Sequence, residues 1–96
     1  MVSYSLTHEA DLDLEEIYEY TIRKFGLEQA DKYLLGLHDG FQIIVQNPML
    51  GRSANEVKAK LRRFEYQSHV VFYVSEANKI LVMRILHHSM DVEKHL

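Results

Sequence analysis

The sequence predicts an α+β fold in which an antiparallel two-helix hairpin packs on a mainly antiparallel sheet. Two segments with the apolar spacing of helices follow each other, separated by a single glycine. Three β-branched and aromatic runs fill the C-terminal third, and a short alternating segment begins the chain. The expected order is β-α-α-β-β-β, followed by a short terminal helical turn.

The first strand and first helix are predicted from the N-terminal quarter. Val2, Tyr4 and Leu6 alternate with serines, the pattern of a strand with one buried face. Thr7 can cap the next helix, because its hydroxyl can accept a hydrogen bond from a free amide of the first turn. Gly26 is expected to end this helix. Its expected buried stripe is Ala10, Leu14, Ile17, Tyr18, Thr21 and Phe25.

The second helix has the most regular apolar period, formed by Ala30, Tyr33, Leu34, Leu37, Phe41, Ile44 and Val45. It is expected to stop before Pro48, because the residue before a proline is pushed out of the helical region. Gly26 leaves almost no linker, so the two helices are expected to form a hairpin. Gly36 and Gly40 lie beside the apolar stripe, where they either allow close approach of a neighbouring helix or simply weaken this one.

The C-terminal third is predicted to form an antiparallel three-strand meander, with strands at about residues 58–66, 69–74 and 80–86. The first strand should join the same sheet. Arg84 lies among apolar residues, so it needs an ion-pair partner or a route to water. Residues 49–57 are expected to be a surface loop, and Ser89 is expected to cap the terminal turn.

Composition and charge limit the possible functions. The 96 residues fit a single domain, residues 1–96, and the absence of cysteine excludes disulfides and thiolate sites. No segment approaches the roughly 20 apolar residues of a membrane span, so a cytoplasmic protein is expected. Residues 1–48 hold three Lys/Arg and nine Asp/Glu, a balance of -6, whereas residues 49–96 hold eight and five, a balance of +3. This asymmetry indicates either two faces with separate partners or ordinary solvated helix faces opposite a sheet.

Motifs for chemistry are weak. His87, His88, Asp91 and His95 match no established ligand spacing, so no metal or cofactor is predicted. Cleavage of RNA by its own 2′-hydroxyl would need a general base, a general acid and a cation at the phosphate. The candidates for those roles are Arg62, Arg63, His69, Arg84, His87 and His88. His69 is better explained as a partly buried structural histidine.

Four apolar helix residues, Leu12, Tyr20, Leu35 and Ile43, fall outside the buried stripes. Scattered exposed apolar residues are ordinary. If they cluster, they form a groove for a partner's amphipathic helix or added strand, and the acidic half favours a basic partner segment.

Short motifs along nearly the whole chain carry a family resemblance. They are Ala10-Asp-Leu, Ile17-Tyr-Glu-Tyr-Thr21, Phe25-Gly26, Gln29-Ala30, Tyr33, Asn47-Pro48, Leu50-Gly51-Arg52, Leu61-Arg-Arg, Ser68-His-Val-Val-Phe-Tyr73 and Arg84-Ile-Leu-His-His-Ser-Met-Asp91. In this order they resemble the ParE branch of the RelE/ParE toxin superfamily, which implies a RelE/ParE-like fold.

The resemblance implies the toxin of a type II toxin-antitoxin module, a non-enzymatic inhibitor of DNA gyrase and replication. The implied partners are DNA gyrase and a ParD-like antitoxin, with no membrane contact and no sequence-specific nucleic-acid binding. The residues expected to contact the target are Arg62, Arg63, Tyr66, Arg84, His87, His88, Met90 and Asp91. Those expected to contact the antitoxin are Leu12, Tyr20, Leu35 and Ile43.

The RelE branch, whose members cut messenger RNA on the ribosome, supplies the alternative. The sequence departs from the RelE pattern, because His69-Val70-Val71 stands where that branch has an arginine and the segment His95-Leu96 carries no tyrosine. His87 and His88 fall near the expected position of basic catalytic groups, so an mRNA endonuclease stays the second interpretation.

Overall fold

The computed structural model describes residues 3–96. Its elements are β1 (Ser3–Leu6), α1 (His8–Phe25), α2 (Leu27–Gln46), β2 (Arg52–Ser53), β3 (Arg62–Tyr66), β4 (His69–Glu76), β5 (Lys79–His87) and a 3₁₀ turn, η1 (Val92–Lys94). The predicted α+β order is confirmed with one addition, because the two-residue strand β2 lies in the segment predicted as a loop. Val2, expected on the first strand, lies outside the described residues.

The five strands form one mixed sheet in the order β1-β5-β4-β3-β2. β1 runs parallel to β5, and the other neighbours are antiparallel. The pairing of β4 with β5 contains an irregularity that places Arg84 opposite Phe72 and Val82 opposite Tyr73, which leaves Met83 unmatched. Such a bulge redirects the side chains that follow it.

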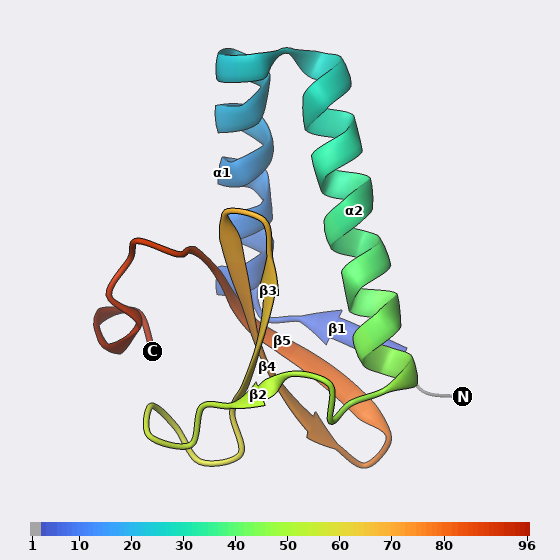
Figure 1. Ribbon diagram of the computed structural model, residues 1–96, viewed down its shortest axis with the longest axis vertical. Helices are drawn as coiled ribbons and strands as arrows, with labels where there is room; N and C mark the ends of the chain where they lie inside the picture. The colour runs from blue at the N-terminus through green and yellow to red at the C-terminus, as the bar shows by residue number, and fades with distance from the viewer. Residues whose placement is uncertain (1–2) are drawn as a thin grey trace.

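The two helices form a hairpin that projects beyond the strands (Figure 1). They are joined by Gly26 alone, whose φ of +93° is a conformation that side-chain-bearing residues rarely adopt. Thr7 caps α1 as predicted, since its hydroxyl accepts from the Ala10 amide at 3.1 Å. The same hydroxyl donates to the Met83 carbonyl at 2.6 Å, so the cap also ties α1 to β5.

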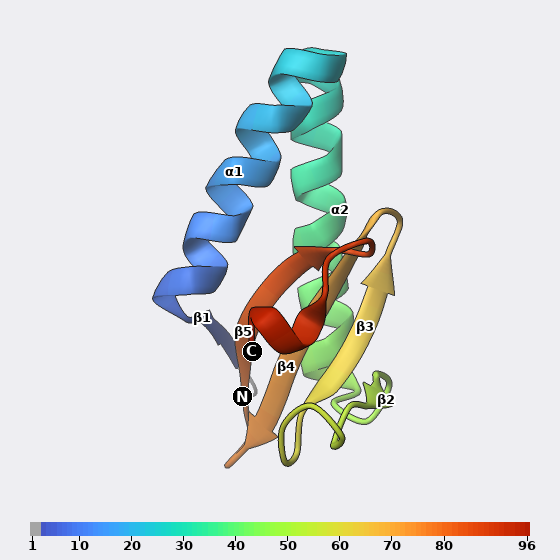
Figure 2. The ribbon, with the colours of Figure 1, turned by 90° about the vertical axis from the view of Figure 1, so that its left-hand side faces the viewer.

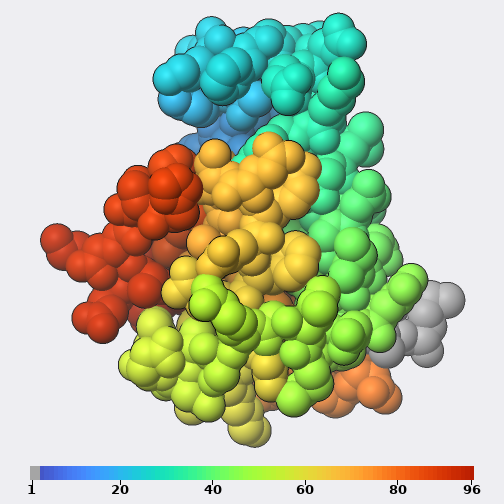
Figure 3. All heavy atoms as spheres, in the orientation of Figure 1, coloured from blue at the N-terminus to red at the C-terminus, as the bar shows by residue number. Residues whose placement is uncertain are grey.

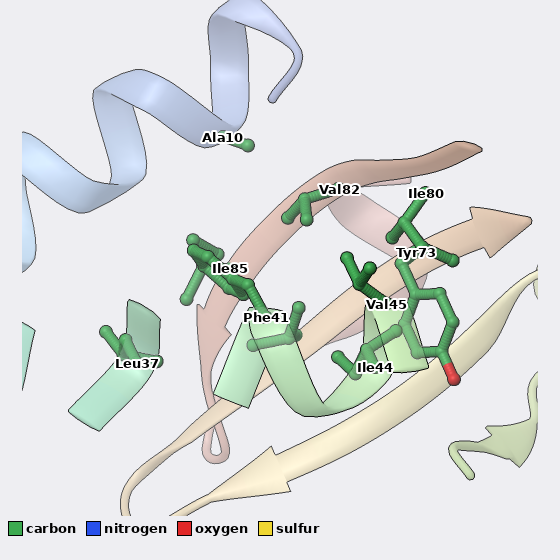
Figure 4. Close-up of a cluster of buried hydrophobic side chains, with 10 residues drawn as sticks. Ala10, Leu37, Phe41, Ile44, Val45, Tyr73, Ile80, Val82 and Ile85 are labelled. Carbon is green, nitrogen blue, oxygen red and sulfur yellow. The ribbon is translucent and has the colours of Figure 1, made fainter. Parts of the chain in front are cut away.

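The main core lies between the helices and one face of the sheet (Figure 4). Its buried members are Ala10, Leu37, Phe41, Ile44, Val45, Val71, Tyr73, Ile80, Val82 and Ile85. A smaller cluster of Ala54, Leu61, Val70, Phe72 and Leu86 forms a second core. Val92 and Leu96 pack against this second cluster, and Figure 2 shows the C-terminal turn lying over the strands on the side away from α2.

Packing corrects two predictions about the helices. Phe25, expected in the buried stripe, is 62% exposed because the hairpin tip extends past the sheet. Gly36 and Gly40 do not serve a contact between helices. A Cβ at Gly36 would overlap the Tyr66 hydroxyl, and one at Gly40 would lie 3.1 Å from the Phe64 ring. Both glycines therefore let α2 approach the aromatic side chains of β3.

Two boundaries also differ from the prediction. The strand expected from about residue 58 begins at Arg62, because the preceding residues form a turn in which the Lys60 amide donates to Asn55 Oδ1 at 2.8 Å. Asp91, rather than Ser89, caps the terminal turn by accepting from the Glu93 amide at 3.1 Å. Within residues 3–96 no helix is both long and apolar enough to cross a membrane.

Candidate functional site

A cleft of about 520 Å³ opens between α1, the end of β5 and the C-terminal segment. Its α1 wall carries the acidic residues Asp13, Glu16 and Glu19. The opposite wall carries Arg84, His87 and His95, and apolar side chains lie between the walls. In Figure 3 the C-terminal residues (red) protrude at one side of the molecule beside the strands. The cleft is therefore lined by elements from both ends of the chain.

Arg84 is bound internally. Its Nε and Nη2 donate to the two carboxylate oxygens of Asp13 at 2.8 and 3.0 Å, and its Nη1 donates to the His95 carbonyl at 3.0 Å. The Asp13 hydrogen bond, more than the burial that opposes it, raises the pKa of Arg84 above its usual range. The expectation that Arg84 needs a partner is thus met by Asp13.

Aromatic and imidazole rings gather where β4 and β5 meet the cleft. His69 Nδ1 lies 2.7 Å from the Tyr33 hydroxyl, and the His87 and His88 rings stack with centroids 4.4 Å apart. Burial, and then the nearby His87 and His88, lower the pKa of His69 from 6.5 to about 4. His69 is therefore neutral at pH 7, as a partly buried structural histidine should be.

His87 is held in one tautomer. The Ser89 amide donates to His87 Nδ1 at 3.2 Å, so this nitrogen is an acceptor and the neutral ring carries its proton on Nε2. The Ser89 hydroxyl lies 2.7 Å from the same nitrogen. Ser89 thus orients a histidine instead of capping the terminal turn.

Arg62 and Arg63 lie on opposite faces of β3, because successive side chains of a strand alternate. Arg62 Nη1 donates to the Gly51 carbonyl at 2.6 Å and so anchors the loop after α2. The Arg63 guanidinium lies 5.5 Å from the Phe72 ring centroid. The two arginines therefore do not lie side by side on one face of the sheet.

Residues 4–92 match the family model described as "ParE toxin of type II toxin-antitoxin system, parDE". The chain belongs to the ParE toxin family. Toxin ParE1 of Mycobacterium tuberculosis is 36% identical to it over 94 residues, which are 97% of this chain and 96% of the relative. Toxin ParE1 of Caulobacter vibrioides is 34% identical over 96 residues, or 100% and 99% of the two chains.

A solved structure described as "Chromosomal ParDE TA system from P. aeruginosa" shares the fold of this ParE chain. The TM-score is 0.76, and the match covers 91% of this chain and 96% of that one. The sequence identity is only 23%. The same arrangement of hairpin and sheet is therefore found in two chains whose sequences differ at most positions.

The residues expected to contact the target of this ParE chain occupy three settings. Arg62 and Arg84 are bound to main-chain or carboxylate oxygens; Arg63, Tyr66 and His87 are half-buried; His88, Met90 and Asp91 are exposed. Tyr66, His87 and His88 meet at one end of the sheet, since Tyr66 pairs with His69 and His69 pairs with His87.

The four residues expected to contact an antitoxin are all exposed, namely Leu12, Tyr20, Leu35 and Ile43. Neither of the two hollows described within residues 3–96 is lined by all four. Tyr20 lines the large cleft, whereas Leu35 lines a smaller apolar groove of about 380 Å³ bordered by β1, α1 and α2. Leu12 and Ile43 line neither of these two hollows.

Sequence reasoning missed Asp13 and Tyr33 as site residues. The apolar neighbours of Arg84 indicated an ion-pair partner or a route to water, but α1 offers six acids and only packing selects Asp13. Tyr33 was placed in the buried stripe, with no sign of its hydrogen bond to His69. Among residues 3–96 no group of three or more His, Cys, Asp or Glu side chains is placed to hold a metal ion.

Proposed function

We propose that this chain, acting as a single cytoplasmic domain, is a growth-inhibiting toxin that binds DNA gyrase and blocks replication. The observation that carries the proposal is the ParE family match over residues 4–92, which includes the motif from Arg84 to Asp91. The proposed action is binding, without bond cleavage by the chain itself.

The proposed gyrase contact is the exposed C-terminal segment together with the neighbouring sheet end. His88, Met90 and Asp91 are exposed, and the half-buried Tyr66 and His87 adjoin them. Exposed groups next to a fixed scaffold suit recognition, because little ordering is needed on binding. Arg84 supports this surface from inside through its hydrogen bond to the His95 carbonyl. Arg62 is bound to the Gly51 carbonyl at the other end of β3, and Arg63 lies against the Phe72 ring.

The proposed silencing partner is a ParD-type antitoxin that covers the exposed apolar side chains of the helices, Leu12, Tyr20, Leu35 and Ile43. Five exposed acidic residues lie on the same helix as Leu12 and Tyr20, namely Glu9, Asp11, Glu15, Glu16 and Glu19. A partner segment that combines apolar and basic side chains fits both features, since burial of apolar area supplies affinity and charge steers association.

Purified chain added to gyrase tests the proposal. Supercoiling of relaxed plasmid should fall and linear, cleaved DNA should rise, and the antitoxin from an adjacent reading frame should reverse both effects. Unchanged supercoiling and cleavage at micromolar toxin would contradict gyrase inhibition. Cleavage of translated message on ribosomes, lost in the His87→Ala, His88→Ala double variant, would instead establish the RelE-like endonuclease.

A matched pair of methionine variants locates the contact. Met90→Ala should weaken gyrase inhibition, whereas Met49→Ala should not. Both methionines are exposed, at 49% and 69%, but Met49 lies in the loop after α2. Equal effects of the two substitutions would count against the C-terminal segment as the contact.

A further inference from the structure

One guanidinium joins three separate parts of the chain. Arg84 is on β5, Asp13 is on α1, and His95 follows η1. The three nitrogens of the Arg84 guanidinium are divided between them, with two donating to the Asp13 carboxylate and one, at 3.0 Å, to the His95 carbonyl. A planar guanidinium holds its donors at fixed angles, so the helix and the C-terminal segment are oriented relative to each other.

The Asp13–Arg84 pair is shielded from water. Its side chains are 11% and 20% exposed, whereas those of the other three ion pairs found in residues 3–96 are between 30% and 89% exposed. The Ile85 amide also donates to Asp13 Oδ2, at 2.9 Å. The Asp13 carboxylate thus accepts three hydrogen bonds from Arg84 and Ile85 of β5. These two residues follow the part of β5 that is paired with β1.

The C-terminal segment has few other attachments. In the described part of the chain, the hydrogen bonds of residues 91–96 are all within that segment except the one from Arg84 to His95. Val92 and Leu96 add apolar contacts to the smaller core. A three-residue 3₁₀ turn is too short to be stable by itself, so its orientation depends on these contacts.

We propose that Asp13 and Arg84 are positioning residues, which fix the C-terminal segment in the orientation that contacts gyrase without touching the target themselves. This inference rests on the proposed function. According to this inference, toxin potency depends in part on the Asp13 carboxylate of α1. Asp13 lies on the wall of the cleft opposite the C-terminal segment, which makes the proposed gyrase contact.

Arg84→Lys is the decisive variant. Lysine keeps a positive charge beside Asp13, but its ammonium group cannot present the separate, fixed donor that Arg84 gives His95. Backbone order parameters for residues 92–96, from NMR relaxation, should fall from about 0.8 to below about 0.6, while those of β4 and β5 stay unchanged. A wild-type segment already below that value, or an unchanged segment in the variant, would overturn the inference.

Gyrase inhibition supplies the second measurement. The toxin concentration that halves supercoiling should rise about tenfold in Arg84→Lys, because the loosened segment must be ordered on binding. Glu16→Gln is the matched control. Glu16 lies on the same wall of the cleft, one turn further along α1, and its carboxylate has no hydrogen bond to Arg84 among those described.

The two proposals fail in different ways. A wild-type chain that leaves gyrase untouched removes the proposed function. A wild-type chain that inhibits gyrase, together with an Arg84→Lys variant that is equally potent despite a mobile segment, removes only the positioning role. A loss of potency as large in Glu16→Gln as in Arg84→Lys would show that the charge of the wall matters and not the attachment to His95.

Discussion

His69 lies at the end of the sheet between Tyr33 of α2 and His87 of β5. Its Nδ1 is 2.7 Å from the Tyr33 hydroxyl, and burial is the largest cause that lowers its pKa to about 4. In the unfolded chain the same imidazole binds a proton near its ordinary pKa of 6.5. The folded state therefore binds fewer protons than the unfolded state between these two values.

Stability should fall as the pH is lowered from about 6.5 towards 4, because protons then favour the unfolded chain. With a discount for partial solvent exposure, His69 should account for about 1 kcal/mol of the loss between about pH 7 and pH 5. Urea unfolding of the wild type and His69→Gln at both pH values checks this. The variant should lose less stability than the wild type, and an equal loss would show that His69 does not titrate as described.

At the scale of elements, α2 and β3 approach each other closely because Gly36 has no side chain. A Cβ placed there would overlap the Tyr66 hydroxyl. Tyr33 of α2 packs edge-on against the Tyr66 ring, with 5.2 Å between the ring centroids. A glycine inside a helix normally costs up to about 1 kcal/mol relative to alanine. Glycine is needed here despite this cost, because the Tyr66 side chain occupies the space that a Cβ would fill.

Gly36→Ala should therefore destabilise the fold by about 1–3 kcal/mol through overpacking, although it improves the intrinsic helix propensity. In a Tyr66→Ala background the obstruction is gone, and the same substitution should become stabilising by up to about 1 kcal/mol. A thermodynamic cycle of the four proteins measures the coupling. If Gly36→Ala has the same sign in both backgrounds, the close approach to Tyr66 is not the reason for the glycine.

At the scale of the whole molecule, the two proposed contact surfaces lie on different elements. The helical hairpin carries most of the acidic excess, whereas Arg62, Arg63 and Arg84 lie on the strands. The exposed apolar residues Leu12, Tyr20, Leu35 and Ile43 are on the hairpin, and the exposed C-terminal segment follows β5. Of those four helix residues, Tyr20 lines the cleft together with Met90 of the C-terminal segment.

The two proposed binding activities should thus be separable. Leu35→Asp should weaken antitoxin binding and leave gyrase inhibition near the wild-type level, because Leu35 is 63% exposed and lines the smaller groove. His88→Ala should weaken gyrase inhibition and leave antitoxin binding near the wild-type level. Titration of each variant with antitoxin, followed by the supercoiling assay, checks both. Joint loss of both activities in each variant would mean that the partners share one surface.

The sequence determined the elements and the order in which they occur. Apolar periodicity located α1 and α2, Thr7 and Pro48 marked helix limits, and the β-branched and aromatic runs located β3, β4 and β5, because these signals depend on neighbours along the chain. β2 was missed because a two-residue strand has no period. The family resemblance was equally readable, since its motifs are local.

Only the tertiary structure decided which distant residues meet. It selected Asp13 among six acids of α1 as the partner of Arg84, bound Arg62 to the Gly51 carbonyl, and used Gly36 for contact with a strand. It also placed Tyr20 and Leu35 in two different hollows and left Leu12 and Ile43 outside both. Such contacts depend on how helices and sheet pack, because residues more than 70 positions apart, as Asp13 and Arg84 are, leave no shared pattern in the sequence.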